Sequence, residues 1–257
     1  MFYKPESVII TNFENNIQRV ILNRPSKKNA ITKQMYLDLT TIITESAKND
    51  AVHALVMTGN GDFYSSGNDF VSYMMESTDI DERDTSEVKN FVDTLILYPK
   101  LLIAIVNGPA VGIAATTLAL FDIVYACDTA YFWTPFCKLG LSPEGCSSYT
   151  FSKIMGPSKT SEVLFFGEKL TAREAAHCGL VSKVYKPGAV DEVWSHINKI
   201  ASLSKESMAS TKKLLSRWNQ KVLLEVNKEE MNILSGIYRK SDFVERVFQF
   251  MSKKSKI

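Results

Sequence analysis

The residue best placed to move a proton is Glu144, a lone carboxylate in an uncharged stretch. No other acidic or basic side chain lies between residues 139 and 152. Burial would raise the pKa of this carboxyl group towards that of a useful general base. The same residues also fit an ordinary glutamate in the first turn of a helix capped by Ser142, and both interpretations stay open here.

Two glycine-rich turns could supply hydrogen-bond donors beside such a base. Residues 61–69 and residues 107–113 each follow a short apolar run and lead towards a helix. Glycine permits backbone geometry with outward-pointing N–H groups, and a helix starting near Ile113 adds free N–H groups and a positive dipole end. The first turn lacks the Gly-Lys-Ser/Thr of a phosphate-binding loop and the Gly-x-Ser-x-Gly of a nucleophile turn. Each turn could also be a plain connection.

Alternating strands and helices would have to position these turns. Apolar runs predict strands at residues 8–10, 20–22, 54–57, 102–106, 123–126 and 180–184, the first two forming a hairpin across residues 12–16. Periodicity predicts helices at residues 33–48 with Thr32 as cap, 86–97 and 113–120, and mostly helix beyond residue 145. Residues 76–87 are polar and predict a mobile loop. The order predicts an α/β core at residues 1–200 and a helical C-terminal region at residues 201–257.

Bulk composition excludes several classes of protein. The chain has 257 residues, of which 45% are hydrophobic and 23% charged, a balance typical of soluble globular proteins. The net charge of +2 argues neither way about nucleic acid, and no nucleic-acid partner is expected. Residues 101–121 are almost uncharged, but the turn at residues 107–109 argues against a membrane span. The four cysteines form no Cys-x-x-Cys pair and the three histidines are scattered, so we expect a reducing compartment and no metal.

The sequence ends in Ser255-Lys256-Ile257, preceded by two lysines. This differs from the peroxisomal Ser-Lys-Leu address only in its last aliphatic residue, which predicts a peroxisomal location. A solvated basic tail is the alternative. The N-terminal residues contain no Arg-rich amphipathic segment, so a mitochondrial location is less expected.

Together these segments resemble the crotonase (enoyl-CoA hydratase/isomerase) superfamily. The matching motifs are residues 23–25 with 29–30, residues 63–69, residues 107–112 followed by 121–122, and residues 167, 170–175 and 179–181. The resemblance spans about residues 8–250, and the order of its motifs is highly specific. Residues 65–69 and 142–148 look most like the peroxisomal Δ3,Δ2-enoyl-CoA isomerases of fatty acid β-oxidation.

This resemblance implies a spiral of ββα units, with C-terminal helices from about Glu206 onward supporting a homotrimer or a dimer of trimers. The partner is an enoyl-CoA thioester, and no cofactor is implied beyond the coenzyme A of the substrate. The oxyanion hole would use the backbone N–H groups of Ser66 and of Ile113, just after Gly112. The implied substrate-binding residues are Ser65, Ser66, Gly67, Asn68, Asp69, Gly112, Lys27, Lys28 and Phe136, although the two lysines could equally be exposed loop residues. Phe136, Trp133 and Phe70 are candidates for an apolar wall along the acyl tail, or for ordinary core residues.

Departures from the family pattern indicate the subclass. Related hydratases carry two glutamates, at the positions that Thr116 and Phe136 occupy here. Hydration needs one group to position water and another to protonate carbon, whereas one carboxylate can move a proton from C2 to C4. The sequence therefore predicts an isomerase with Glu144 as its base. The alternatives are a dienoyl-CoA isomerase and a catalytically silent acyl-CoA-binding protein.

Overall fold

The computed structural model describes residues 7–70, 72, 85–240, 242, 243, 245–247 and 249. The strands are β1 (Ile9–Glu14), β2 (Ile17–Leu22), β3 (Ala54–Gly59), β4 (Leu101–Val106), β5 (Ala110–Val111), β6 (Ile123–Cys127), β7 (Tyr131–Trp133), β8 (Leu170–Thr171) and β9 (Lys183–Tyr185). The α-helices are α1 (Lys33–Lys48), α3 (Ser86–Leu97), α4 (Ile113–Thr116), α5 (Ser147–Ser161), α6 (Ala172–Cys178), α7 (Val190–Ile197), α8 (Lys205–Ser216) and α9 (Gln220–Tyr238). Short 3₁₀ or π segments are η1 (Pro25–Lys27), η3 (Thr117–Leu120), η4 (Cys137–Leu139), η5 (Glu162–Phe166) and η6 (Asn198–Ser202).

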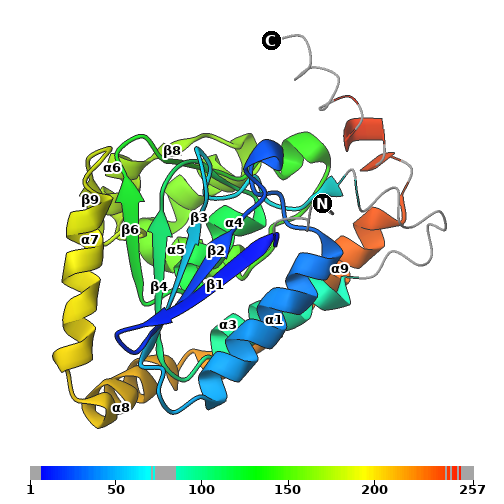
Figure 1. The fold of residues 1–257 in the computed structure, drawn as a ribbon. Helices are drawn as coiled ribbons and strands as arrows, with labels where there is room; N and C mark the ends of the chain where they lie inside the picture. The colour runs from blue at the N-terminus through cyan, green and yellow to red at the C-terminus, as the bar shows by residue number, and fades with distance from the viewer. Residues whose placement is uncertain are drawn as a thin grey trace, which may run out of the picture.

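A six-stranded sheet in the order β1-β2-β3-β4-β6-β9 forms the centre of the fold (Figure 1). Only the β1–β2 pair is antiparallel, and the other neighbours run parallel. The hairpin predicted at the N-terminus is confirmed, but its strands are longer than expected. The chain reverses at Asn15 and Asn16, whose φ values of 51° and 62° suit a tight two-residue turn.

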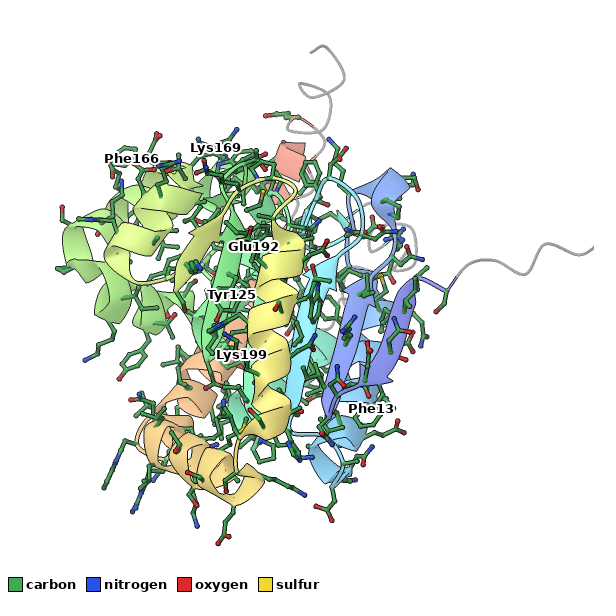
Figure 2. The ribbon with its side chains drawn as sticks, turned by 60° about the vertical axis from the view of Figure 1, so that its left-hand side comes forward. Phe13, Tyr125, Phe166, Lys169, Glu192 and Lys199 are labelled. Atoms are coloured by element: carbon green, nitrogen blue, oxygen red, sulfur yellow. The ribbon has the colours of Figure 1, made fainter. Side chains whose placement is uncertain are left out.

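Each face of this sheet has its own helical cover, because successive side chains of a strand point to opposite faces. Leu55 faces the larger core, which α1, α3 and α9 close, whereas Val56 faces a smaller core. The smaller core is closed by α7 and η6, and Figure 2 shows α7 lying over β6 near Tyr125. The middle strands β3, β4 and β6 are therefore buried on both faces, as parallel strands require, whereas most of the edge strand β1 is exposed.

The predicted helices at residues 33–48 and 86–97 are confirmed. Thr32 caps the first by accepting a hydrogen bond from the Met35 N–H. The helix expected at residues 113–120 is one turn of α-helix followed by a 3₁₀ turn. Of the loop predicted at residues 76–87, residues 76–84 lie outside the described part of the chain, and 86 and 87 belong to α3.

A second sheet of three short strands, β5-β7-β8, was not predicted from the sequence. It ties the second glycine turn, through β5, to the segment that leads towards Glu144, through β7. The strand predicted at residues 180–184 is wrong in its bounds, because the paired residues are Lys183–Tyr185. The α/β class with a helical C-terminal part is confirmed. No helix within the described residues has the length and apolar character that a membrane span requires.

Candidate active site

Glu144 lies between η4 and α5 and lines a cavity of about 410 Å³. Its side chain is only 3% exposed. The alternative reading as a first-turn helical glutamate is wrong, because α5 begins at Ser147 with Cys146 at its N-cap position and without a side-chain cap. The fold therefore holds Glu144 in an irregular connection that lines the cavity, just before α5.

Burial is the chief reason that the pKa of Glu144 is raised to about 8. A hydrogen bond from Asn68 opposes this rise, the negative charge of Glu230 adds to it, and a backbone hydrogen bond from Ile113 opposes it. At neutral pH the carboxyl group is thus mostly protonated, and its basic form grows as pH rises. The sequence predicted the direction of this shift from the uncharged surroundings.

The side chain of Asn68 bridges Glu144 and Tyr36. Its amide nitrogen Nδ2 lies 3.2 Å from Oε1 and 3.3 Å from Oε2 of Glu144, and its Oδ1 accepts a hydrogen bond from the Tyr36 hydroxyl. Burial, reinforced by the charge of Glu144, raises the pKa of Tyr36 well above its ordinary value, so this hydroxyl remains a donor. The Tyr36 bond thereby fixes which end of the amide faces the carboxylate.

The two glycine-rich turns, which the sequence left open as plain connections, lie against each other. Ser65 pairs with Ala110, and the Val111 N–H donates to the Ser65 carbonyl at 3.0 Å. Gly67 is required at this contact: its φ is +84°, and a Cβ atom there would stand 2.5 Å from the Val111 carbonyl oxygen. Gly112, also predicted at the oxyanion hole, follows directly and lines the cavity, but its own N–H is not free because it donates to the Trp133 carbonyl at 2.8 Å.

The predicted oxyanion donor Ser66 is contradicted by the structure. Its N–H already donates to the Lys28 carbonyl at 2.9 Å. Ser65, predicted to bind substrate, is fully buried, and its hydroxyl donates to the Asn29 carbonyl and accepts from the Gly67 N–H. Both serines therefore hold the loop together.

The donors that remain near the base are two other N–H groups. Within the described part of the chain, the Asn68 N–H has no hydrogen-bond partner, and Asn68 lines the cavity. The Ile113 N–H lowers the pKa of the Glu144 carboxyl group, although the Ile113 side chain is buried and does not line the cavity.

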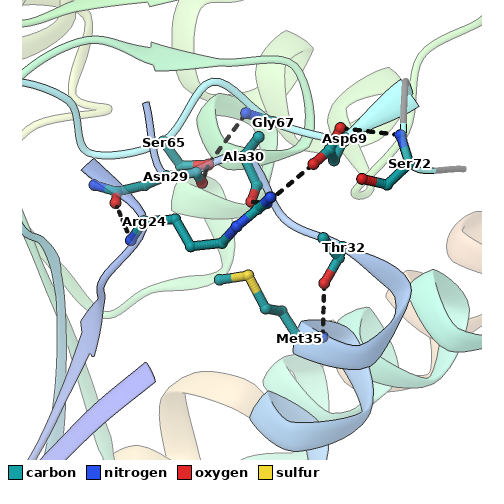
Figure 3. A network of polar contacts seen from close by, with 9 residues as sticks. All are labelled: Arg24, Asn29, Ala30, Thr32, Met35, Ser65, Gly67, Asp69 and Ser72. Carbon is teal, nitrogen blue, oxygen red and sulfur yellow. Dashed lines mark hydrogen bonds and ion pairs between the residues drawn. The ribbon is translucent and has the colours of Figure 1, made fainter. Parts of the chain in front are cut away.

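Arg24 and Asp69 hold the loop of residues 65–69 in place (Figure 3). Arg24 Nη1 lies 3.0 Å from Asp69 Oδ2, and both side chains are largely buried. Asn29, also fully buried, accepts from the Arg24 N–H and donates to the carbonyls of Asn60 and Phe63. The predicted substrate-binding Asp69 is thus paired with a cation, and hydrogen bonds from Ser72 and Arg24 outweigh burial and lower its pKa.

The remaining predicted residues surround the same cavity. Lys27 and Lys28 are exposed at its rim, on and just after η1. Phe136, Trp133 and Phe70 all line it, and Phe136 and Phe70 also pack in the larger core. The described lining residues with carboxyl groups are Asp69 and Glu144, and Arg24 is the partner of the first.

Thr116 fills the place of a hydratase carboxylate. It is fully buried behind Gly145, where a Cβ atom at Gly145 would stand 2.5 Å from Thr116 Oγ1. The other hydratase position holds Phe136, an apolar wall residue. Neither position presents an acid to the cavity.

Sequence reasoning missed Tyr36, Arg24 as an anchor, and Glu230. A signal for Glu230 exists: the buried face of α9 comprises Asn227, Glu230, Met231, Leu234 and Tyr238. This is a helical stripe in which two polar residues stand at apolar positions. A polar residue there must find a partner in the core, which marks it for attention.

Comparisons with known proteins show which family the chain resembles in sequence and fold. The family model described as "Enoyl-CoA hydratase/isomerase" matches residues 12–256. Human enoyl-CoA delta isomerase 2 is 43% identical over 98% of this chain, which spans 65% of that protein's length. Mouse enoyl-CoA delta isomerase 3, peroxisomal, is 41% identical over 96% of this chain and 79% of its own. A crystal structure of an enoyl-CoA hydratase/isomerase from Pseudoalteromonas atlantica superposes with a TM-score of 0.88 at 29% identity, covering 96% of this chain and 98% of that one.

Proposed function

The chain belongs to the enoyl-CoA hydratase/isomerase family, and from that premise we propose that it is a Δ3,Δ2-enoyl-CoA isomerase with Glu144 as its single base. The observation that carries this proposal is a buried carboxylate facing a cavity in which the other described carboxyl group is paired with Arg24. One unpaired base suits a proton shuttle better than a hydration, which needs two groups.

The substrate would bind with its thioester oxygen at the N–H groups of Asn68 and Ile113. The lysines at the rim, Lys27 and Lys28, are positioned for the phosphates of coenzyme A, and the aromatic wall for the acyl chain. A thioester oxygen at the Ile113 N–H would compete with Glu144 for this donor, and its loss would raise the pKa of Glu144 and make it a stronger base.

Glu144 would then remove a proton from C2 of a 3-enoyl-CoA. Charge develops on the thioester oxygen, where each fixed N–H donor lowers the barrier by roughly 3 kcal/mol. Return of the same proton to C4 gives the conjugated 2-enoyl-CoA. This route uses no metal and no redox cofactor.

The test is isomerisation of trans-3-enoyl-CoA esters of graded chain length, followed by the absorbance of the conjugated thioester. Glu144→Gln should bind the thioester but lose turnover by roughly 10²–10⁴-fold. Turnover of the variant at the wild-type rate would refute the assignment of the base. A wild-type protein that binds the ester without turnover would be the silent acyl-CoA-binding alternative.

Two finer proposals concern assembly and location. The end of α8 and the residues just beyond it expose three apolar side chains, Leu214, Leu215 and Trp218, which support a trimer contact. Sedimentation would test this assembly.

The mouse relative's peroxisomal name supports a peroxisomal location. The predicted targeting residues 255–257 lie outside the described residues, and imaging of a tagged chain with and without them tests the location.

A further inference from the structure

Glu230 is a buried carboxylate that the proposed chemistry does not use. It lies on α9, 84 residues beyond Cys146, and is only 5% exposed. Its Oε2 accepts from the Cys146 N–H at 2.7 Å, and its Oε1 accepts from the Ser148 N–H at 2.9 Å and from the Ser148 hydroxyl. Burial has the largest effect and raises the pKa of Glu230 above its ordinary value, while these three donors favour the ionised carboxylate and oppose that rise.

The backbone around these donors has an unusual shape. Gly145 and Cys146 are both left-handed, with φ values of 66° and 64°. This conformation costs a residue with a Cβ atom roughly 1–2 kcal/mol, so Cys146 needs outside support. Successive left-handed and helical residues turn their N–H groups to one side and form an anion-binding hollow, here at the N-terminus of α5. The Glu230 carboxylate occupies that hollow.

This hollow begins one residue after Glu144. The Glu144 carbonyl accepts from the Ser147 hydroxyl at 2.8 Å, and Gly145 packs on Thr116. The direction in which Glu144 leaves the backbone is therefore set by a turn that Glu230 holds from the opposite side. Glu230 itself does not line the cavity.

We propose that Glu230 is a positioning residue, which locks the turn at residues 145–148 and thereby aims the Glu144 carboxylate into the cavity. This inference rests on the proposed isomerase function. It makes the C-terminal helix α9 part of the active site of its own chain, in addition to any role in assembly.

A second effect of Glu230 gives the proposal a distinct readout. Its negative charge is one of the causes that raise the pKa of Glu144, after burial. The other groups that face Glu144 are the Tyr36 hydroxyl from α1, the Asn68 amide and the Ile113 N–H. Glu230 in turn faces the Cys146 thiol, whose pKa is raised by burial, by Glu230 and by Asp93 of α3. Removal of the Glu230 charge should move the protonation of Glu144 to lower pH.

Three variants separate these effects. Glu230→Gln removes the charge and keeps the shape, Glu230→Asp keeps the charge but cannot reach both N–H groups, and Glu229→Gln is the exposed control on the same helix. We expect kcat for 3-enoyl-CoA to fall roughly 10- to 100-fold in both Glu230 variants, because small displacements of a base are costly, while KM is unchanged. In the profile of kcat against pH, activity falls at low pH as Glu144 takes up a proton. This acid limb should move to lower pH in Glu230→Gln and stay in place in Glu230→Asp and Glu229→Gln.

The comparison of the two Glu230 variants with the control Glu229→Gln decides whether the proposal stands. If both Glu230 variants match Glu229→Gln in kcat and pH midpoint, or lose activity only in proportion to their unfolded fraction, Glu230 is a structural residue alone. The protonation midpoint of Glu144, followed by carboxyl ¹³C NMR, reports on the same coupling without turnover. A wild-type chain that does not isomerise refutes the proposed function, whereas Glu230 variants that keep the kcat and pH midpoint of Glu229→Gln refute this inference.

Discussion

The loop at residues 65–69 and the turn at residues 144–148 both present groups to the cavity, but they are anchored by opposite chemistry. The loop is tied by an ion pair between Asp69 and Arg24, 45 residues apart. The turn is tied by the Glu230 carboxylate on backbone donors. A cation beside the turn would lower the pKa of Glu144 and weaken it as a base, whereas a carboxylate raises that pKa. The loop at residues 65–69 supplies hydrogen-bond donors and not the proposed base, so the Arg24 cation beside it does not weaken that base.

The largest expected effect is on stability, and it tests the free-energy cost of ionising the buried Glu144 carboxyl group in the turn at residues 144–148. The pKa of Glu144 is about 8 in the folded chain and 4.5 in its ordinary state. Between these values the folded state holds a proton that the unfolded state has lost, so raising the pH through this window destabilises the fold. Glu144→Gln lacks this penalty and should exceed the wild type in unfolding free energy by ~5 kcal/mol at pH 9 but by little at pH 4. Urea unfolding of both proteins at the two pH values measures this difference, and a pH-independent difference would contradict the buried carboxyl group.

The next effect tests the bridge between the two regions. Asn68→Ala removes the side chain that bonds Glu144 and leaves the backbone N–H in place. We expect kcat to fall by roughly 10- to 100-fold with little change in KM. Because Asn68 lowers the pKa of Glu144, the acid limb of the pH profile should move to higher pH, opposite to Glu230→Gln. A limb that moves the same way in both variants would show that the two anchors are not electrostatically opposed.

Loss of the ion pair between Arg24 and Asp69 should affect the stability of the fold more than the rate of catalysis. Removal of one partner of a largely buried pair leaves the other unpaired, so Arg24→Met and Asp69→Asn should each cost about 2 kcal/mol of unfolding free energy. A double-mutant cycle should show coupling between them. Additive effects would mean that the pair does not act as a unit. Lys27→Met, at the exposed rim, is the matched control and should leave stability unchanged.

The smallest effect belongs to Tyr36. Tyr36→Phe removes the hydroxyl that orients the Asn68 amide. The amide can still bond Glu144 but is no longer held in one orientation, so kcat should fall by only about two- to fivefold, in keeping with the ~0.5–1 kcal/mol of a neutral hydrogen bond. Steady-state kinetics beside Asn68→Ala check this order, and a larger loss in Tyr36→Phe than in Asn68→Ala would contradict the proposed chain of contacts.

Local patterns were enough to predict the main elements. Thr32 and the apolar periodicity behind it predict α1, and buried runs such as residues 54–57 predict the central strands. The short strands β5, β7 and β8 were missed, because two or three residues carry too little periodicity and pair only with distant partners. The choice of Ser66 as donor failed for a related reason: a motif does not reveal which N–H group a neighbouring carbonyl, here that of Lys28, has already taken.

The sequence by itself determined the α/β succession, the two glycine turns and the one uncharged stretch that isolates Glu144, since these depend on residue type and spacing along the chain. Only the tertiary structure decided that the carboxyl group is buried, that Asn68 and Ile113 face it, and that Glu230 supports its turn from 84 residues away. Burial and hydrogen-bond partnership are properties of distances in space. In a folded chain those distances are set by packing between elements, which no local pattern encodes.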